Sequence, residues 1–128
     1  MRLAILVTAP AYGSQGSASA YMFTQAAIEM GHEIQGIFFY QQGVTNANNF
    51  TTPASDEDDL VKLWQTLAVA HGFSLDVCIS AALRRGVVDS VSAQEQQLAA
   101  ANLQAPFAMT GLGQLAELSS RADRLVQF

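Results

Sequence analysis

The sequence predicts an α/β fold, a three-layer α/β/α sandwich around a mainly parallel, five-stranded sheet. Short apolar runs alternate along the chain with longer segments of helix-compatible residues, and Gly, Pro or polar turns separate them. Strands that alternate with helices pair in parallel through right-handed crossovers. At 128 residues the chain has the length of one domain, so we expect a single domain over residues 1–128.

The first three elements are a strand, a helix and a second strand. Residues 2–8 (RLAILVT) form an apolar run, which is typical of a strand buried on both faces. Residues 17–30 contain neither Gly nor Pro, and Gly31 supplies a left-handed stop, so they predict a helix. Residues 33–40 (EIQGIFFY) predict the second strand.

A long polar segment, residues 41–54, follows the second strand. Connections longer than about 12 residues tend to serve binding, so we expect this segment to gate a site. Ser55 and the three acids after it predict a capping box. A helix then extends to Gly72, because apolar residues recur at the helical period at Leu60, Leu63, Trp64 and Leu67.

The second half of the chain continues the alternation. Residues 73–79 are a short apolar run, so the third strand is expected to end at or beside Cys78. A helical turn at residues 81–85 stops at Gly86. The remaining elements expected are a helix at 91–101, a strand at 107–110, a helix at 112–120 and a strand at 124–128.

Charge is sparse and its balance is acidic. Only 13% of the residues are charged, where about 25% is typical, so much of the surface must be neutral or apolar and should contact partner proteins. Residues 17–27 carry almost no charge, and we expect another subunit to cover part of this helix. With 11 acidic against 6 basic residues, the net charge of −5 disfavours direct nucleic-acid binding.

Cysteine and histidine are scarce. A single cysteine cannot form an internal disulfide, and one cysteine with two histidines is too few for the usual zinc sites. We therefore expect no metal and no cofactor. The apolar stretch at residues 3–7 is too short for a signal peptide or a membrane span, so a cytoplasmic location without membrane contact is expected.

Cys78 is the strongest candidate for a catalytic residue. Active sites of open parallel sheets lie outside the carboxyl ends of the strands, which is where Cys78 is expected. The positive end of a following helical turn, together with Arg84 and Arg85, would favour the nucleophilic thiolate. A free cysteine is also often a small buried hydrophobe, and position alone leaves both interpretations open.

The two histidines are not expected to assist Cys78. His32 and His71 each end a helix and precede a strand, so they belong at the amino ends of the strands. A strand of five residues spans about 17 Å, which is beyond hydrogen-bond reach of the sulfur. A Cys–His hydrolase is therefore disfavoured, and both histidines are interpreted as residues that meet the negative end of a helix dipole.

Other candidate features have simpler structural interpretations. The loop with Gly13 and Gly16 lacks the GK[ST] ending of a phosphate loop, so it is interpreted as a turn into an N-cap at Ser17 that could border Cys78. The acids at residues 56–59 are interpreted as N-terminal helix residues rather than metal ligands. Large side chains expected in the core are Tyr21, Met22, Phe23, Phe38, Phe39 and Tyr40.

Four segments together resemble the TusD/DsrE sulfurtransferase family, and most closely its TusD branch. They are, in order, AILVTAPAYGSQGS, FFYQQGVTNANN with TTPASDEDDLVKLWQ, DVCISAALRRGVVD with Cys78, and MTGLGQLAELSSRADRLVQF. The resemblance spans the whole chain. It implies a DsrE-like fold and a sulfurtransferase in which Cys78 accepts sulfane sulfur as a persulfide.

The same resemblance implies the partners of a sulfur relay. A TusA-like protein would donate the sulfur and a TusE-like protein would accept it, toward 2-thiolation of the wobble uridine of certain tRNAs. TusB-like and TusC-like subunits would complete a heterohexamer. Three alternatives stay open: a DsrE-type subunit of sulfur oxidation, a non-catalytic scaffold subunit, and a flavodoxin-like cofactor binder.

Overall fold

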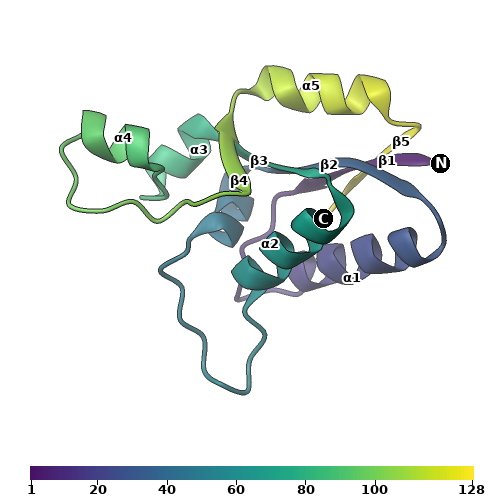
Figure 1. The fold of residues 1–128 in the computed structure, drawn as a ribbon, viewed down its shortest axis with the longest axis horizontal. Helices are drawn as coiled ribbons and strands as arrows, with labels where there is room; N and C mark the ends of the chain where they lie inside the picture. The colour runs from purple at the N-terminus through teal and green to yellow at the C-terminus, as the bar shows by residue number, and fades with distance from the viewer.

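The computed structural model describes all residues, Met1 to Phe128, and confirms the α/β class (Figure 1). Strands and helices alternate, and η1 is a 3-10 helix. In chain order the elements are β1 (Arg2–Val7), α1 (Gly16–Glu29), β2 (Glu33–Phe39), η1 (Gln41–Ala47), α2 (Leu60–His71), β3 (Ser74–Cys78), α3 (Ile79–Arg84), α4 (Ser90–Glu95), β4 (Phe107–Thr110), α5 (Leu112–Arg121) and β5 (Arg124–Gln127).

The five strands form one sheet in the order β4-β3-β2-β1-β5, and every neighbouring pair is parallel. Each strand is connected to the next by a crossover that contains at least one helix, because parallel neighbours cannot be joined by a tight turn. At the carboxyl edge Val7 pairs with Phe39 and Phe39 pairs with Val77. The ends of these strands therefore meet at one edge of the sheet.

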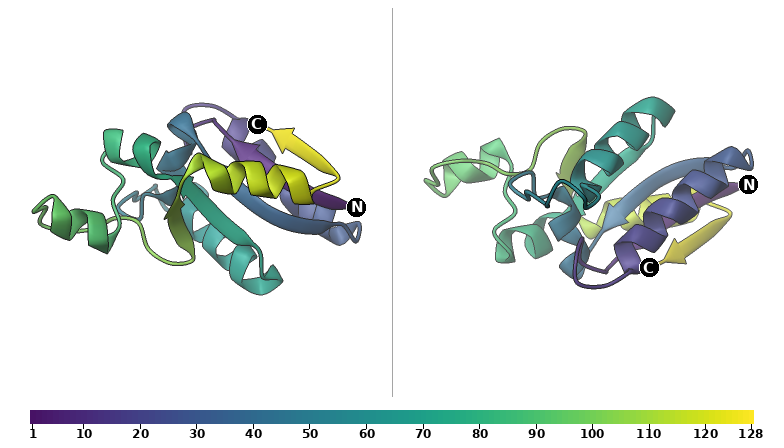
Figure 2. Two further views of the ribbon diagram at one scale, coloured as in Figure 1. Left: turned by 90° about the horizontal axis from the view of Figure 1, so that it is seen from above. Right: turned by 90° about the horizontal axis from the view of Figure 1, so that it is seen from below.

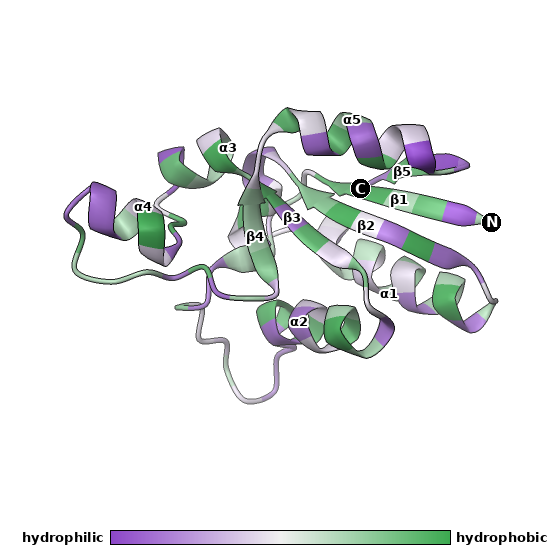
Figure 3. Ribbon diagram, turned by 45° about the horizontal axis from the view of Figure 1, so that its top comes forward, coloured by the Kyte–Doolittle hydropathy of each residue, from purple (hydrophilic) through white to green (hydrophobic).

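The expected three layers are present (Figures 1 and 2). Helices α1 and α2 cover one face of the sheet, and α5 covers the other. The short helices α3 and α4 lie beyond the carboxyl ends of β3 and β4, at the left of Figure 1. Figure 3 shows that hydrophobic residues gather in the central strands, whereas hydrophilic and hydrophobic residues alternate along α5.

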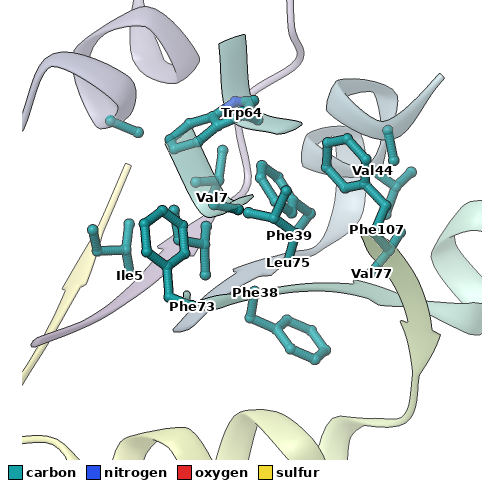
Figure 4. Packing of buried hydrophobic residues seen from close by; sticks show 14 of the residues in the cluster. Ile5, Val7, Phe38, Phe39, Val44, Trp64, Phe73, Leu75, Val77 and Phe107 are labelled. Atoms are coloured by element: carbon teal, nitrogen blue, oxygen red, sulfur yellow. The ribbon is translucent and has the colours of Figure 1, made fainter. Parts of the chain in front are cut away.

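The main core fills the space between the sheet and the two helices α1 and α2 (Figure 4). Trp64 of α2 stands edge-on to Phe39, with ring centroids 5.5 Å apart, and to Tyr21 of α1 at 5.3 Å. Such edge-to-face pairs add stability beyond the buried area. Phe38 points to the opposite face, where α5 lies (Figure 4). Of the large side chains expected in the core, only Met22 is wrong, because it is 59% exposed.

Helices α1 and α2 begin elsewhere than expected. Helix α2 begins at Leu60, where its buried stripe begins, and its N-cap is Asp59, whose carboxylate accepts from the Lys62 N–H at 3.2 Å. The expected capping box at Ser55 is wrong. The segment before Asp59 forms a separate exposed turn, in which the Glu57 N–H donates to the Ala54 carbonyl at 3.0 Å and the Glu57 carboxylate accepts from the Ala54 N–H at 3.1 Å. Ser17 is likewise not an N-cap: it is buried and its hydroxyl donates to the Ala9 carbonyl.

Helix α4 is shorter than the helix expected at residues 91–101. Gln97 adopts a left-handed conformation with φ of 57°, which ends the helical path. The side chain of Asn102 then ties the chain back, because its Oδ1 accepts from the Val88 N–H at 2.7 Å and its Nδ2 donates to the Gly86 carbonyl at 2.9 Å. Local hydrogen bonds of this kind compete with helix formation.

The polar segment at residues 41–54 is not an open loop. Its first half is η1, which buries Gly43, Val44, Asn46 and Ala47. Gly43 lies so close to β1 that an added Cβ would stand 2.0 Å from the Val7 carbonyl oxygen. None of the helices in the structure combines the length and apolar character needed to cross a membrane.

Candidate functional site

Cys78 lies where the sequence predicts it, at the carboxyl edge of the sheet. It is the last residue of β3 and the N-cap of α3. Its thiol is free, but the residue is only 4% exposed. The side chain accepts no capping hydrogen bond from α3, which has only six residues. The N–H groups of α3 therefore donate no hydrogen bond to the sulfur.

A cavity of about 480 Å³ gives Cys78 a path to solvent. Its wall comes from the ends of β2, β3 and β4, from both ends of α3 and from the start of α5. Ile79 and Leu112 are 40% and 51% exposed, so the cavity rim is partly apolar. The lining residues are Tyr40, Cys78, Ile79, Ser80, Arg84, Thr110, Gly111 and Leu112. A reactant would thus reach the sulfur through this cavity rather than on an open surface.

Only one of the two candidate arginines faces this cavity. Arg84 belongs to its lining, and no carboxylate does. Arg85 instead turns back along α3, where its Nη1 donates to the Ala81 carbonyl at 3.1 Å. The ion pairs of the structure involve neither residue. Arg84 alone therefore supplies positive charge beside Cys78.

Thr110 is a site residue that the sequence reasoning missed. It is the last residue of β4 and pairs with Cys78 across the parallel ladder. Both residues line the same cavity. The Oγ1 atom of Thr110 is buried and has no hydrogen-bond partner. The sequence could have indicated it, because a strand at residues 107–110 that pairs in parallel with the strand of Cys78 would end beside Cys78.

Asp76 was also missed, although an acid within an apolar run is unusual. It lies two residues before Cys78 on β3, so both side chains point to the α5 face of the sheet. Its carboxylate is buried and accepts from the Ser74 hydroxyl at 2.7 Å and from Gln114 Nε2 at 3.5 Å. Because Gln114 belongs to α5, Asp76 connects β3 with the helix whose first residue borders the cavity.

Both histidines lie at the opposite edge of the sheet, as the sequence predicts. They line a separate cavity of about 290 Å³, together with Glu33 and Phe73. The Nδ1 atom of His32 stands 2.8 Å from the amino nitrogen of Met1. Neither imidazole is placed to act on Cys78.

The loop with Gly13 and Gly16 does not border Cys78, so that expectation is wrong. It lies after β1, which β2 separates from β3. Together with Glu57 and Asp58, residues of this loop line a different cavity of about 550 Å³. The segment at residues 41–54 contributes nothing to the Cys78 cavity either, so it does not gate it.

Comparison with known proteins shows the family and the fold of the chain. A sequence model of the DsrE/DsrF-like family matches residues 1–128. Among solved structures, the chain is similar to the ychN protein from E. coli, with a TM-score of 0.79 and 16% sequence identity. The alignment covers 99% of this chain and 98% of that chain. At this identity the likeness shows a shared fold.

Proposed function

Because the chain belongs to the DsrE/DsrF-like family, whose members are implicated in sulfur relay, we propose that it carries sulfane sulfur as a persulfide on Cys78. One observation carries the proposal: the only cysteine ends a central strand at the wall of a cavity that also contains a cationic side chain. Sulfur relay requires a thiolate that another protein's cysteine can approach. It requires neither a metal nor a general-base histidine.

The transfer step is a thiol exchange. The Cys78 thiolate attacks the outer, sulfane sulfur of the donor's persulfide. A sulfur–sulfur bond to Cys78 forms while the bond to the donor cysteine breaks. The donor sulfur takes up the proton of its persulfide and leaves as a thiol, and the Cys78 persulfide remains as an anion. The oxidation state of the transferred sulfur does not change, so no external oxidant is consumed. Release to the acceptor repeats the same exchange in the other direction.

Arg84 has a specific part in this chemistry. A persulfide and a thiolate are both anions, and a guanidinium beside the cavity favours both. Because Arg84 is exposed, its effect is moderate and decreases with added salt. The apolar rim at Ile79 and Leu112 suits contact with another protein.

Within this chemistry we propose the role of the TusD branch. The donor is TusA-like, the acceptor is TusE-like, and TusB-like and TusC-like subunits form a heterohexamer with this chain in the cytoplasm. The sulfur then serves 2-thiolation of the tRNA wobble uridine. The support for this role is the resemblance of four sequence segments to that branch, together with sparse surface charge that favours stable partners.

A cellular experiment tests this role. Cells that lack the chromosomal copy would carry either the wild-type chain or Cys78→Ser, and 2-thiouridine would be measured in digested tRNA. The expected result is that the wild type restores 2-thiouridine and Cys78→Ser does not. Normal 2-thiolation with Cys78→Ser would contradict the role, provided that both chains accumulate to the same level.

The family description also favours a second candidate, a DsrE-type subunit of a sulfur-oxidation relay. The two candidates share the persulfide on Cys78 and differ in the final acceptor. Cells with Cys78→Ser that keep normal 2-thiouridine but no longer oxidise reduced sulfur would favour this candidate over the TusD role.

The low exposure of Cys78 favours a third candidate, a scaffold subunit with a buried, inert thiol. Alkylation with iodoacetamide separates it from a carrier. For a carrier, the native protein should react at a rate that does not depend on added urea below the unfolding transition, because the cavity already admits the reagent. A thiol that reacts only when the protein unfolds would support the scaffold.

A further inference from the structure

The Oγ1 atom of Thr110 is an unusual feature of the Cys78 cavity. It is buried without a hydrogen-bond partner, whereas most buried polar side-chain atoms in proteins have one. The hydroxyl makes no hydrogen bond to the sulfur of Cys78 either, although the two residues are paired on neighbouring strands. A buried donor without a partner is unfavourable, so the resting structure leaves a hydrogen bond unused.

Binding of sulfur would change this situation. Paired residues on neighbouring strands lie about 4.8 Å apart, and a persulfide extends the cysteine side chain by about 2 Å. The added atom must enter the cavity, because Cys78 and Thr110 both form its wall. The hydroxyl of Thr110 thereby gains an anionic sulfur within its neighbourhood.

We propose that Thr110 Oγ1 donates a hydrogen bond to the sulfane sulfur of the Cys78 persulfide and thereby stabilises the loaded state. This inference rests on the proposed carrier function and adds a second residue to its site. Loading transfers the outer sulfur of a donor persulfide to the Cys78 thiolate, one sulfur–sulfur bond forms as another breaks, and the donor leaves as a thiol. Thr110 takes no part in bond exchange: it holds the product anion together with Arg84.

The experiment measures the equilibrium constant for loading. Purified protein is equilibrated with glutathione and glutathione persulfide at stepped ratios, and the loaded fraction is read from the intact mass. Thr110→Val removes the hydroxyl and keeps the shape of the side chain, whereas Thr110→Ser keeps the hydroxyl. Hydrogen bonds to charged groups are strong enough that Thr110→Val should lower the loading constant about tenfold or more. Thr110→Ser should stay within about threefold of the wild type.

A second measurement separates this role from a structural one. In the unloaded protein the hydroxyl has no partner, so Thr110→Val should melt at the wild-type temperature or above it. Loading should then raise the melting temperature of the wild type and of Thr110→Ser more than that of Thr110→Val. A clearly lower melting temperature for unloaded Thr110→Val would show that the hydroxyl supports the fold, and would overturn the inference.

The remaining outcomes distinguish this inference from the function beneath it. If the wild type and Thr110→Val load with the same constant, the inference is wrong and the carrier function stands. If the wild type never gains the mass of one sulfur atom under any ratio, both are wrong.

Discussion

The indole of Trp64 donates a hydrogen bond from Nε1 to Oδ1 of Asn46, 3.1 Å away in the interior of the protein. The amide nitrogen of Asn46 in turn donates to the Ser17 hydroxyl and to the Gly43 carbonyl, each at 2.9 Å. One fully buried side chain thus connects η1 with α1 and α2. It holds the 3-10 helix against the carboxyl edge of the sheet.

Replacing Asn46 should therefore destabilise the folded protein. Asn46→Leu leaves the Trp64 N–H and the Gly43 carbonyl without these partners, and each buried group that loses its partner costs about 1–3 kcal/mol. We expect the free energy of unfolding in urea to fall by about 2–4 kcal/mol. Gln42→Ala, at an exposed position of η1, is the matched control and should change it little. Equal stability of the two variants would show that the network is not required.

Gly43 gives a second test of the same element. An added Cβ would stand 2.0 Å from the Val7 carbonyl oxygen, a backbone atom that cannot move aside alone. Gly43→Ala should destabilise the protein by about 2 kcal/mol or more, because η1 must separate from β1. In the control Gly113→Ala the new methyl meets no atom within 4 Å, and helix α5 should gain up to about 1 kcal/mol. Thermal unfolding of both variants measures the contrast, and a Gly43→Ala chain as stable as the wild type would refute this close packing.

Arg2 and Asp123 join the two ends of the chain. The Arg2 guanidinium donates to Asp123 at 2.9 Å and the Arg2 backbone N–H donates at 2.7 Å. These bonds, the guanidinium first, lower the pKa of Asp123 from 3.8 to about 2. In the unfolded chain the carboxylate takes up a proton at a higher pH than in the folded protein. The stabilisation is therefore complete above about pH 4 and is lost as the pH falls toward about 2.

Acid titration of the free energy of unfolding checks this prediction. Asp123→Asn should be less stable than the wild type at neutral pH, and the difference should shrink steadily as the pH falls from about 4 through about 2. The effect is small because both side chains are exposed to solvent. Glu29→Gln removes an exposed acid that forms no ion pair in the structure, and it should show no such pH dependence. A difference for Asp123→Asn that persists unchanged at pH 2 would contradict the assignment.

The contrast between Arg84 and Arg85 tests the electrostatics of the cavity. Arg84 lines it, whereas Arg85 bonds to its own helix. Arg84→Gln should slow alkylation of Cys78 by iodoacetamide about two- to fivefold at neutral pH and low salt, because the cavity then lacks the positive charge that favours an anionic sulfur. The difference should fade in concentrated salt. Arg85→Gln should react like the wild type, and the opposite ranking would refute the role of Arg84.

The path of the backbone was largely predictable from the sequence. Each of the five strands contains a short apolar stretch, and the structure places all of them within about a residue of their expected ends. The signal is strongest in β1, which lies inside the sheet and is buried along most of its length, because strands buried on both faces are apolar. Helix ends were less predictable at Leu60 and at Glu95, since tertiary packing and the Asn102 hydrogen bonds determine them.

The site was predictable only in part. The order of strands and helices alone predicts that Cys78 lies at the carboxyl edge of the sheet and that His71 lies at the opposite edge. Which arginine lines the cavity depends on the rotation of α3, which the sequence does not reveal. The proximity of Thr110 to Cys78 depends on strand pairing, and the connection of Asp76 to α5 depends on its contact with Gln114. The polar segment at residues 41–54 looked like a binding loop. In the structure the buried Asn46 side chain bonds its first half to α1 and α2, a connection that no periodic pattern reveals.

The most direct test of the account is the mass of the intact protein after exposure to a sulfane donor. Wild-type protein incubated with sodium polysulfide and then desalted should gain the mass of one sulfur atom, and a thiol reductant should remove it. Because Cys78 is the only cysteine, Cys78→Ser has no thiol and should gain nothing. A sulfur atom that is retained by Cys78→Ser, or a folded wild type that never acquires one, would contradict the proposal that this chain carries sulfur on Cys78.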